Sequence, residues 1–436
     1  MTRLLCAASA LIVWASAAGV VAAPAEPAFP ARPGGAVYKP AYRFPIIEAI
    51  ESRRDSLQAL RDAARDSVDA GYAQTARRQR DEALSLRVDW RGVRKPSGPE
   101  AFGATFHFPP VAQYDTGTCW AFCSTSFFES EVARLTGRRV KLSEMWTVYW
   151  EYVEKARRFV QEYGHSPVVE GSQDHGTQEI YRLYGAVPAE VYAGVLAPEG
   201  LHDHPPLRDE IWEYLQYVQA GDYWLEDQVV ACVRGILDRR LGTPPETFVY
   251  AGETYTPRRF LSEVLRLDPD DYVNCMSTLK QSFGPGALLD VPDNWRRKSD
   301  YVNLPLDEFY RVVKETVQGG GTVSIGGDTS EPGMDGLEDA AIIPEWDIPA
   351  EHIGQDAREL RIVNGATGDD HGVHIVGFLR HGGRDWFLAK DSNRSSRLGQ
   401  FKGYFFYDGD YVRLKMLACL VPREALARVR PQWAQR

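Results

Sequence analysis

The residue with the clearest chemical potential is Cys119, which stands where an apolar, helix-forming pattern begins. A cysteine in the first turn of a helix lies at the positive end of the helix dipole, beside backbone N–H groups that have no intrahelical acceptor. Both features stabilise a thiolate, the form of cysteine that attacks carbonyl carbons. The side-chain amide of Gln113, together with the N–H of Cys119, can hold the oxyanion that such an attack creates. The pattern therefore predicts a nucleophilic cysteine.

A nucleophilic thiol needs a base, and that base needs a partner to orient it. His371 opens one strand-like segment, and Asp391 closes another. On neighbouring strands these side chains would be within hydrogen-bonding reach, leaving the second ring nitrogen of His371 to face Cys119. His374 follows three positions later and would point to the opposite strand face, which disfavours joint metal ligation. We therefore predict no metal and no cofactor.

The elements that must position these residues can be read from the periodicity. One helix is predicted from Cys119 to about Gly137, and another from Leu142 to about Tyr163 with Ser143 as its N-cap. Residues 381–385 have the composition of a hairpin turn. Four short apolar runs predict strands, at residues 374–378, 386–389, 404–407 and 417–421. Helices followed by antiparallel strands indicate an α+β architecture.

The N-terminal region has the order of a secretory signal peptide. Arg3 precedes an Ala-rich apolar run that ends in small residues and Pro24. We predict that residues 1–25 are a signal peptide, cleaved after Ala17 or Ala25. The protein is then expected in the periplasm or outside the cell, with no stable membrane insertion after cleavage. Residues 26–87 follow as an extension with a helical pattern from about 46 to 84, which is either an inhibitory pro-segment or a helix packed on the body.

Composition limits the possible partners. The chain has 436 residues, a formal net charge of −10 and a pI of about 5.5, without a run of basic residues, which argues against a nucleic-acid partner. Five cysteines remain after the signal, and an odd number in an exported protein indicates a reactive thiol. A disulfide among the other four is left open. The five are Cys119, Cys123, Cys232, Cys275 and Cys419.

Several segments resemble one enzyme family. Residues 113–122 resemble the nucleophile motif of papain-like cysteine peptidases, and residues 370–378 resemble the segment that holds their catalytic histidine. The long separation of Cys119 from His371, with motifs such as 291–295 and 303–308, is similar to the bleomycin hydrolase and aminopeptidase C branch. The resemblance covers about residues 88–427. It implies a papain-like fold with a helical half and an antiparallel β half, a mixed insertion at about 200–345, and a C-terminal tail at 428–436.

The resemblance also implies a function. It predicts a cysteine peptidase that cleaves peptide or protein substrates through a thioester, as an aminopeptidase or an endopeptidase, and it allows a homo-oligomer. The implied catalytic residues are Cys119, His371, Asp391 and Gln113, and the implied substrate-binding residues are Trp120, Gly171, Ser172 and Asp370.

Three departures from the family pattern affect these expectations. Asp391 stands where the family has asparagine, so we expect activity with an altered pH dependence. Asn393 and Arg394 stand where the family has Trp-Gly, and we expect the loss of the tryptophan to expose the His371–Asp391 pair to water. Aminopeptidases of this branch place their C-terminus in the cleft, and the short tail after Pro422 leaves open whether it reaches that far.

Two other function classes remain open. One is an acyl-transfer enzyme, a transglutaminase or an amidase, that uses the same Cys–His pair. The other is a catalytically inactive homologue that binds peptides in the same cleft. Side-chain preference and oligomeric state are also not determined by the sequence.

Overall fold

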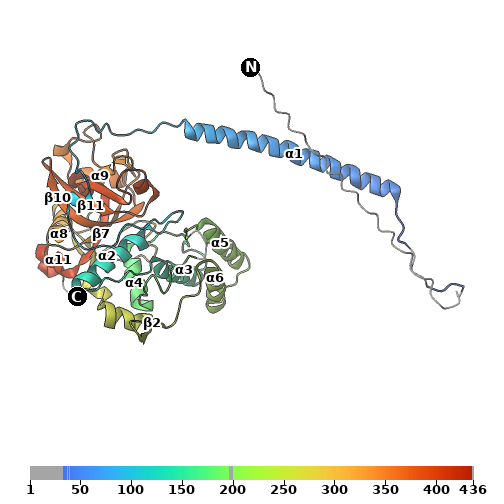
Figure 1. The fold of residues 1–436 in the computed structure, drawn as a ribbon, viewed down its shortest axis with the longest axis horizontal. Helices are drawn as coiled ribbons and strands as arrows, with labels where there is room; N and C mark the ends of the chain where they lie inside the picture. Colours follow the sequence, from blue (N-terminus) through green and yellow to red (C-terminus); the bar gives the residue numbers. More distant parts are fainter. Residues whose placement is uncertain (1–32, 37, 39, 196–199, 435–436) are drawn as a thin grey trace, which may run out of the picture. The chain divides into compact units, whose positions relative to one another are not determined.

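The computed structural model describes residues 33–36, 38, 40–195 and 200–434, which belong to two compact units, 1–84 and 85–436. The predicted signal peptide lies outside the described residues. In the first unit, α1 (Pro45–Asp81) is a single long helix in which every side chain is solvent-accessible, and it confirms the helical pattern predicted for residues 46–84 (Figure 1). Glu48 in its first turn and Arg80 in its last match the polarity of the helix dipole.

The helical half of the second unit contains five helices, gathered together in Figure 1. They are α2 (Cys119–Thr136), α3 (Glu144–Gln161), α4 (Asp174–Tyr184), α5 (Pro205–Ala220) and α6 (Glu226–Leu241). Gly137 ends α2 in the left-handed conformation at φ 69°, which glycine adopts without steric penalty. The Ser143 hydroxyl accepts the N–H of Trp146 and caps α3. Both predicted helices and their caps are confirmed.

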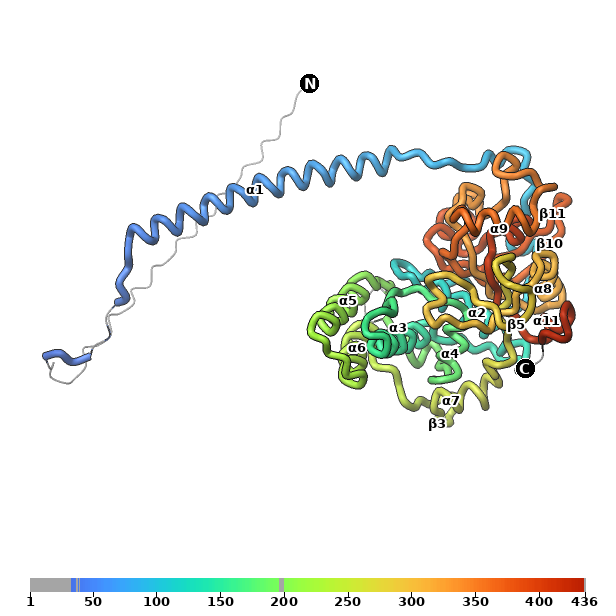
Figure 2. The backbone as a smooth tube through the Cα atoms, turned by 180° about the vertical axis from the view of Figure 1, so that it is seen from behind, coloured from blue at the N-terminus to red at the C-terminus, as the bar shows by residue number. Residues whose placement is uncertain are grey.

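The other half is one mixed sheet of eleven strands, seen from behind in Figure 2. The four strands predicted from the sequence are confirmed as β10 (His371–His381), β11 (Arg384–Lys390), β12 (Tyr404–Asp408) and β13 (Met416–Pro422). β10 and β11 pair antiparallel, and the predicted hairpin turns through Gly382 and Gly383, both with positive φ.

The remaining strands of this sheet come mostly from the segment predicted as an insertion. They are β4 (Tyr272–Met276), β5 (Gly284–Ala287), β6 (Tyr301–Asn303), β7 (Val323–Gly327), β8 (Met334–Asp335), β9 (Ala340–Ala341) and, from nearer the N-terminus, β1 (Gly103–Ala104). The order is β5-β6-β4-β13-β7-β10-β11-β12-β9-β8, with β1 beside β10. β4–β6 and β12–β9 pair parallel and the other pairs are antiparallel. Because β7 lies between β13 and β10, this segment is built into the centre of the sheet.

Smaller elements complete the unit. They are the hairpin β2 (Phe248–Tyr250) and β3 (Glu253–Tyr255); helices α7 (Pro257–Arg259), α8 (Leu306–Gln318), α9 (Gln355–Val363), α10 (Gly409–Lys415) and α11 (Arg423–Val429); the π-helix η2 (Phe260–Leu265); and the 3-10 turns η1 (Pro99–Ala101), η3 (Pro269–Asp271), η4 (Ala350–His352), η5 (Arg394–Arg397) and η6 (Pro431–Trp433). The Thr256 hydroxyl accepts the N–H of Arg259 and caps α7.

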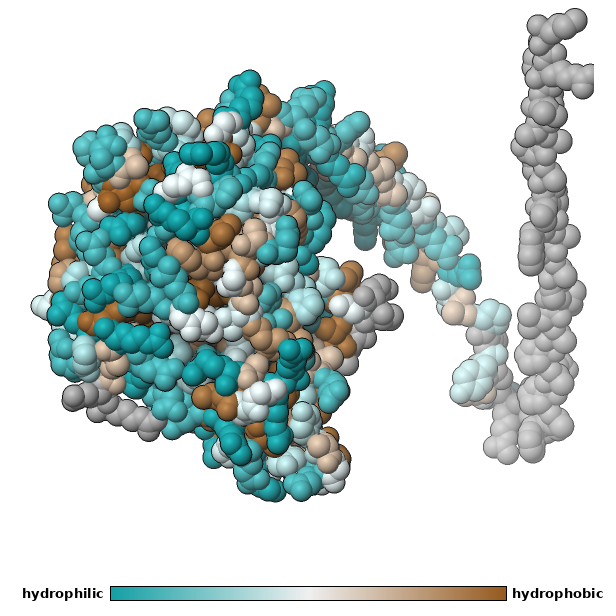
Figure 3. Space-filling model, turned by 60° about the vertical axis from the view of Figure 1, so that its left-hand side comes forward, coloured by the Kyte–Doolittle hydropathy of each residue, from teal (hydrophilic) through white to brown (hydrophobic). Residues whose placement is uncertain are grey.

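Two large apolar cores stabilise the halves. One joins α2, α3, α4 and α6 through residues such as Phe128, Trp146 and Tyr181. The other covers one face of the sheet and includes Ile325 and Ile375. On the face shown in Figure 3, hydrophobic side chains are scattered among hydrophilic ones. Within the described ranges, no helix combines the length and apolar character needed to cross a membrane.

Candidate active site

Cys119 is the first residue of α2, as the sequence predicts, and its side chain is partly exposed. Its N–H donates to no acceptor among the described residues, so it is free to bind an oxyanion. α2 packs against β10, and Gly372 allows the close approach, since a Cβ added there would lie 2.8 Å from the sulfur of Cys123. This packing brings His371, the neighbour of Gly372, to the thiol.

The structure pairs His371 with Asp391. Nε2 of His371 lies 2.8 Å from Oδ1 of Asp391, and the two side chains are 3% and 0% exposed. Oδ1 also accepts the N–H of Asn393 at 2.7 Å, which fixes the carboxylate. Burial acts to lower the pKa of His371, but the charge of Asp391 and the interactions with Asp391 and Cys119 outweigh it, so the pKa lies well above its ordinary value. The surroundings therefore favour the protonated form of His371, which a proton accepted from Cys119 would create.

The expectation that the His371–Asp391 pair would be exposed to water is wrong. The chain after Asp391 folds back over it: the N–H of Asp391 donates to the carbonyl of Gly403 at 2.9 Å, and the Ser396 hydroxyl contacts the carbonyl of Asp391 at 3.4 Å. The His371–Asp391 pair is therefore buried although the family's tryptophan is absent.

Gln113 is buried and held on both ends of its amide. Its Oε1 accepts the Ser392 hydroxyl at 2.7 Å, and its Nε2 donates to the carbonyl of Thr116 at 2.7 Å. Nε2 carries two hydrogens, so one remains for an oxyanion. Glu170 tethers the loop between Gln113 and Cys119, because its carboxylate accepts the N–H of Gly117 at 2.6 Å.

Most of the other candidate residues line or adjoin a small pocket beside Cys119. It is lined by Cys119, Trp120, Cys123, Ser172, Gln173, Asp174, Asp293, Gly326, Asp369, His371 and Gly372. Of the residues predicted to bind substrate, Trp120 and Ser172 line it, and Gly171 adjoins it. Asp370 lies elsewhere: it is exposed, and its carboxylate accepts hydrogen bonds from Thr329 and Ser330.

Sequence reasoning did not identify the acidic residues of this pocket. Asp369 precedes Asp370 directly, and an adjacent pair of acids before the catalytic histidine was the available signal. Asp293 belongs to a recognised family segment, but nothing in the sequence indicates that it lies near Asp369.

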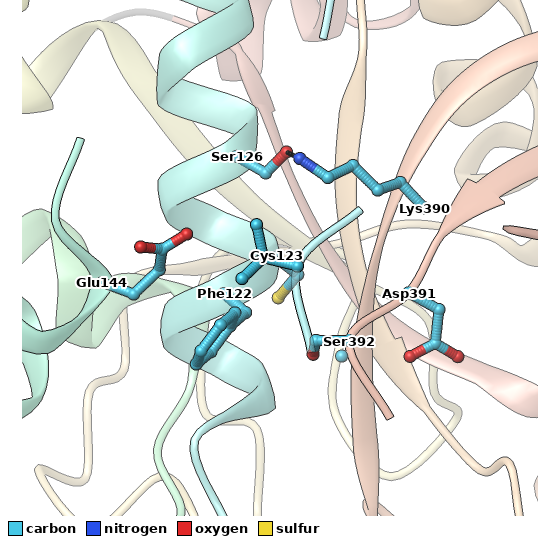
Figure 4. A pocket seen from close by; sticks show the side chains of 9 residues that line it. Phe122, Cys123, Ser126, Glu144, Lys390, Asp391 and Ser392 are labelled. Carbon is cyan, nitrogen blue, oxygen red and sulfur yellow. Dashed lines mark hydrogen bonds between the residues drawn. The ribbon is translucent and has the colours of Figure 1, made fainter. Parts of the chain in front are cut away.

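A second cavity lies behind the nucleophile helix (Figure 4). There the Nζ of Lys390 donates to the Ser126 hydroxyl at 2.8 Å, and that hydroxyl is 2.8 Å from Nδ1 of His374. Burial lowers the pKa of Lys390 to about 8 and the pKa of His374 well below its ordinary value. These buried polar contacts tie α2 to β10 and β11, which fixes the nucleophile against its base.

The described cysteines are all free thiols. Cys275 and Cys419 are direct neighbours across β4 and β13. Among the described residues, no three His, Cys, Asp or Glu side chains are grouped as a metal site.

The described part of the C-terminal tail packs on the sheet half. Trp433 and Ala434 contact the apolar core of that half, and neither lines the pocket of Cys119.

No protein-family model matches the chain. Aminopeptidase C of Streptococcus thermophilus is 24% identical over 262 residues, which are 50% of this chain and 58% of that protein, so the chain spans somewhat more than half of this relative's length. The crystal structure of PepW from Lactobacillus rhamnosis HN001 is similar with a TM-score of 0.63 and 16% identity, over 86% of this chain and 93% of that one. Digestive procathepsin L 3 of Tenebrio molitor aligns at a TM-score of 0.33 and 15% identity, over 78% of this chain and 74% of that one, too weakly to support an argument.

The likeness to PepW confirms the predicted papain-like α+β fold. Together with the aminopeptidase C match, it confirms the resemblance to the aminopeptidase C branch of papain-like cysteine peptidases.

Proposed function

We propose that the chain is a cysteine peptidase that hydrolyses peptide bonds through a thioester on Cys119. One observation carries the proposal: a cysteine at a helix N-terminus shares a pocket with His371, whose far nitrogen is held 2.8 Å from Asp391. A thiol, a base and an orienting carboxylate are the parts that nucleophilic acyl transfer needs.

The first half of the mechanism forms the thioester. His371 takes the proton of Cys119, and the thiolate adds to the peptide carbonyl carbon. The free N–H of Cys119 and the remaining amide hydrogen of Gln113 stabilise the oxyanion. The intermediate collapses as the C–N bond breaks, and the His371 imidazolium protonates the leaving amine.

The second half releases the acid. His371 takes a proton from a water molecule, which attacks the thioester, and the C–S bond then breaks as the thiolate leaves and recovers its proton. Asp391 keeps the imidazole ring oriented through both halves and stabilises its charged form.

The test is mechanism-based labelling combined with turnover. A vinyl-sulfone peptide probe should modify Cys119, as intact and peptide mass spectrometry would show. The variants Cys119→Ala and His371→Ala should fail both to be labelled and to cleave peptides. An unlabelled wild-type protein whose peptide turnover equals that of Cys119→Ala would refute the peptidase function.

We also propose that the protein is exported, because residues 1–25 have the pattern of a signal peptide. N-terminal sequencing of protein recovered from the producing cells tests this. A new N-terminus after Ala17 or Ala25 is the expected result, and an intact Met1 in mature protein would contradict it.

A further inference from the structure

The loop of residues 113–118 joins the two groups that hold the oxyanion, since Gln113 begins it and Cys119 follows its last residue. Within this loop Tyr114 has a φ of 53°, a left-handed value that a bulky residue adopts at a steric cost. A backbone of this kind keeps its conformation only where neighbouring groups hold it. The contacts of the loop therefore decide how well the two oxyanion donors are aligned.

Glu170 contacts the chain on both sides of Cys119. Its carboxylate Oε2 accepts the N–H of Gly117 at 2.6 Å, and its backbone carbonyl accepts the indole N–H of Trp120 at 3.1 Å. A Cβ added to Gly117 would lie 3.2 Å from both Cβ and Oε2 of Glu170, so the loop backbone packs directly on this side chain. Glu170 thus fixes the residue two positions before Cys119 and the residue directly after it.

The other carboxylate oxygen of Glu170 is bonded to His204, the residue that precedes α5. Nδ1 of His204 contacts Oε1 of Glu170, and the two side chains are 3% and 7% exposed. Breaking either contact of this buried carboxylate would leave a polar atom without a partner and away from water, so both contacts fix its orientation. The imidazole of His204 has no hydrogen bond to the loop itself among the described residues, and therefore acts on the loop through Glu170.

The backbone beside His204 pairs with the middle of the loop. The N–H of Asp115 donates to the carbonyl of His202 at 3.2 Å, and the N–H of His204 donates to the carbonyl of Asp115 at 3.1 Å. At the start of the loop, the N–H of Gln113 donates to the carbonyl of Ser392 at 2.9 Å. The loop is thus held at its start, its middle and its end, and His204 contributes to the last two.

The position of the Glu170 side chain indicates which step of the reaction depends on it. The N–H of Cys119 lies two peptide units after that of Gly117, so a rotation of the chain at Gly117 moves this oxyanion donor. The sulfur of Cys119 is carried by α2, and the Trp120 indole that anchors this end of α2 bonds to the backbone of Glu170 rather than to its side chain. Loss of the carboxylate should therefore disturb the oxyanion donors more than the thiol.

We propose that Glu170 and His204 are positioning residues for the oxyanion site. His204 orients the Glu170 carboxylate, and the carboxylate holds the loop so that the N–H of Cys119 and the amide of Gln113 converge on the substrate oxygen. Neither residue lines the pocket beside Cys119, so both act through the loop. The inference rests on the proposed peptidase function and assigns the residues that align its oxyanion donors.

Substitutions of Glu170 test the contact with Gly117. Glu170→Ala should lower kcat for a peptide substrate by about 10-fold to 100-fold, the scale of a misaligned oxyanion donor, with KM changing by less than about 3-fold. Glu170→Gln keeps an oxygen that can accept the N–H of Gly117, so its kcat should stay within about 5-fold of the wild type. Glu246→Ala, at an exposed position, is the control and should keep full activity. Equal kcat in the wild type and Glu170→Ala, or equal losses in Glu170→Ala and Glu170→Gln, would overturn the proposal.

Substitutions of His204 test whether it acts through Glu170. His204→Ala should lower kcat by about 3-fold to 10-fold, and His204→Asn, whose amide can donate from the position of Nδ1, should recover most of that loss. In a Glu170→Ala background, His204→Ala should cause no further loss, because the two residues form one chain of contacts. His165→Ala, at an exposed position, is the control. Losses that multiply in the double variant would overturn the role of His204.

A reaction that creates a tetrahedral oxygen separates oxyanion alignment from a general loss of structure. A peptide aldehyde built on the acyl part of a cleaved peptide adds to Cys119: the C–S bond forms, and the carbonyl oxygen enters the oxyanion site and takes up the thiol proton. Iodoacetamide alkylates the same sulfur by displacing iodide and forms no oxyanion. We expect Glu170→Ala to raise the Kd of the aldehyde by about 10-fold or more, and to leave the alkylation rate within about 3-fold of the wild type. Equal losses in both reactions would place the effect on the thiol and overturn the proposal.

The same measurements distinguish this proposal from the peptidase function itself. If the wild type cleaves peptides and Glu170→Ala equals it in turnover and aldehyde binding, the positioning role fails while the peptidase stands. If the wild type neither cleaves peptides nor reacts at Cys119, the peptidase function fails. Circular dichroism establishes that each variant is folded. Should Glu170→Ala unfold, the comparison of His204→Ala with His204→Asn decides the proposal, and equal kcat in these two variants would overturn it.

Discussion

Acidic side chains lie in two different settings near Cys119, one against the ring of His371 and the other in the pocket beside the thiol. Asp391 is buried against His371, 2.8 Å from its ring, and a backbone N–H fixes the same oxygen. Asp369 and Asp293 line the same pocket as His371, and the nearby charge of Asp293 adds to burial in raising the pKa of Asp369. A carboxylate that contacts the imidazole orients it, whereas burial and a neighbouring negative charge destabilise the ionised form of a carboxylate. The contrast separates Asp391, which holds the ring of His371, from two acids whose ionised forms their surroundings disfavour.

The largest effect on activity is expected from replacing Cys119 or His371. Cys119→Ala and His371→Ala should each lower kcat/KM for an unblocked peptide by at least about 1,000-fold, because nucleophile and base act as a unit. Thermal unfolding of Cys119→Ala should change little, since Cys119 is partly exposed and its removal leaves the core intact. Cys232→Ala, an exposed cysteine on α6, is the control and should keep full activity. Normal turnover by either active-site variant would exclude the pair as catalytic.

Two substitutions of Asp391 test its role beside His371, one removing the whole carboxylate and the other only its charge. Asp391→Ala should lower kcat by about 100-fold or more, because the ring of His371 loses its orienting partner. Asp391→Asn keeps a hydrogen-bond acceptor but removes the charge that raises the pKa of His371. The imidazolium would then lose its proton at lower pH, so the alkaline limb of the kcat/KM profile should move down by about one pH unit or more. An unchanged alkaline limb in Asp391→Asn would show that the charge of Asp391 does not set it.

The group of Cys119, His371 and Asp391 also differs from the pocket acids in how far the sequence could predict its arrangement. The start of α2 at Cys119, the Gly137 and Ser143 caps, and the β10–β11 hairpin follow from local residue preferences, so they were predictable. The partnership of His371 with Asp391 follows from strand register across that hairpin, which is also a short-range constraint. Chemistry that depends on local structure was therefore within reach of the sequence.

The positions of Asp293 and Asp369 beside Cys119 depend on long-range packing instead. Asp293 reaches the pocket because its loop is anchored to Glu151 of α3, and Asp369 arrives at the start of β10 beside β7. Neither contact has a local signature. For the same reason the sequence missed that β7 runs through the centre of the sheet, and that the chain after Asp391 folds back to cover the His–Asp pair.

A steric change tests the position of Asp293 in the pocket without removing a charge. Gly171→Ala would place a methyl group against the Asp293 carboxylate, which must move away. We expect KM for a peptide substrate to rise by about 3-fold to 10-fold, because the displaced side chain changes the pocket beside Cys119, while kcat stays nearly constant. Gly235→Ala, where an added Cβ meets nothing within 4 Å, is the matched control. A fall in kcat with constant KM would instead place the effect of Gly171 on the reacting groups.

The smallest effect is on stability, and the sign of the change in Tm distinguishes substitution of Asp369 from substitution of His371. Asp369 has a folded-state pKa of about 8 against an ordinary value of 3.8, so between these values the folded state binds more protons than the unfolded state. Its contribution to the free energy of unfolding therefore falls as pH rises through this window. Asp369→Asn removes that loss, and its Tm should exceed that of the wild type by about 2 °C or more at pH 8.5, with a smaller difference at pH 5. The contribution of His371 also falls as pH rises, but its cause differs: a partner stabilises the charged form, so the stability that it contributes is complete below pH 6.5 and is lost as pH rises through the folded-state value. Replacing His371 with alanine should thus lower Tm most at acidic pH. Calorimetry of both variants at the two pH values, with Asp300→Asn as the exposed control, measures the difference. A Tm gain for Asp369→Asn that is larger at pH 5 than at pH 8.5 would contradict the raised pKa of Asp369.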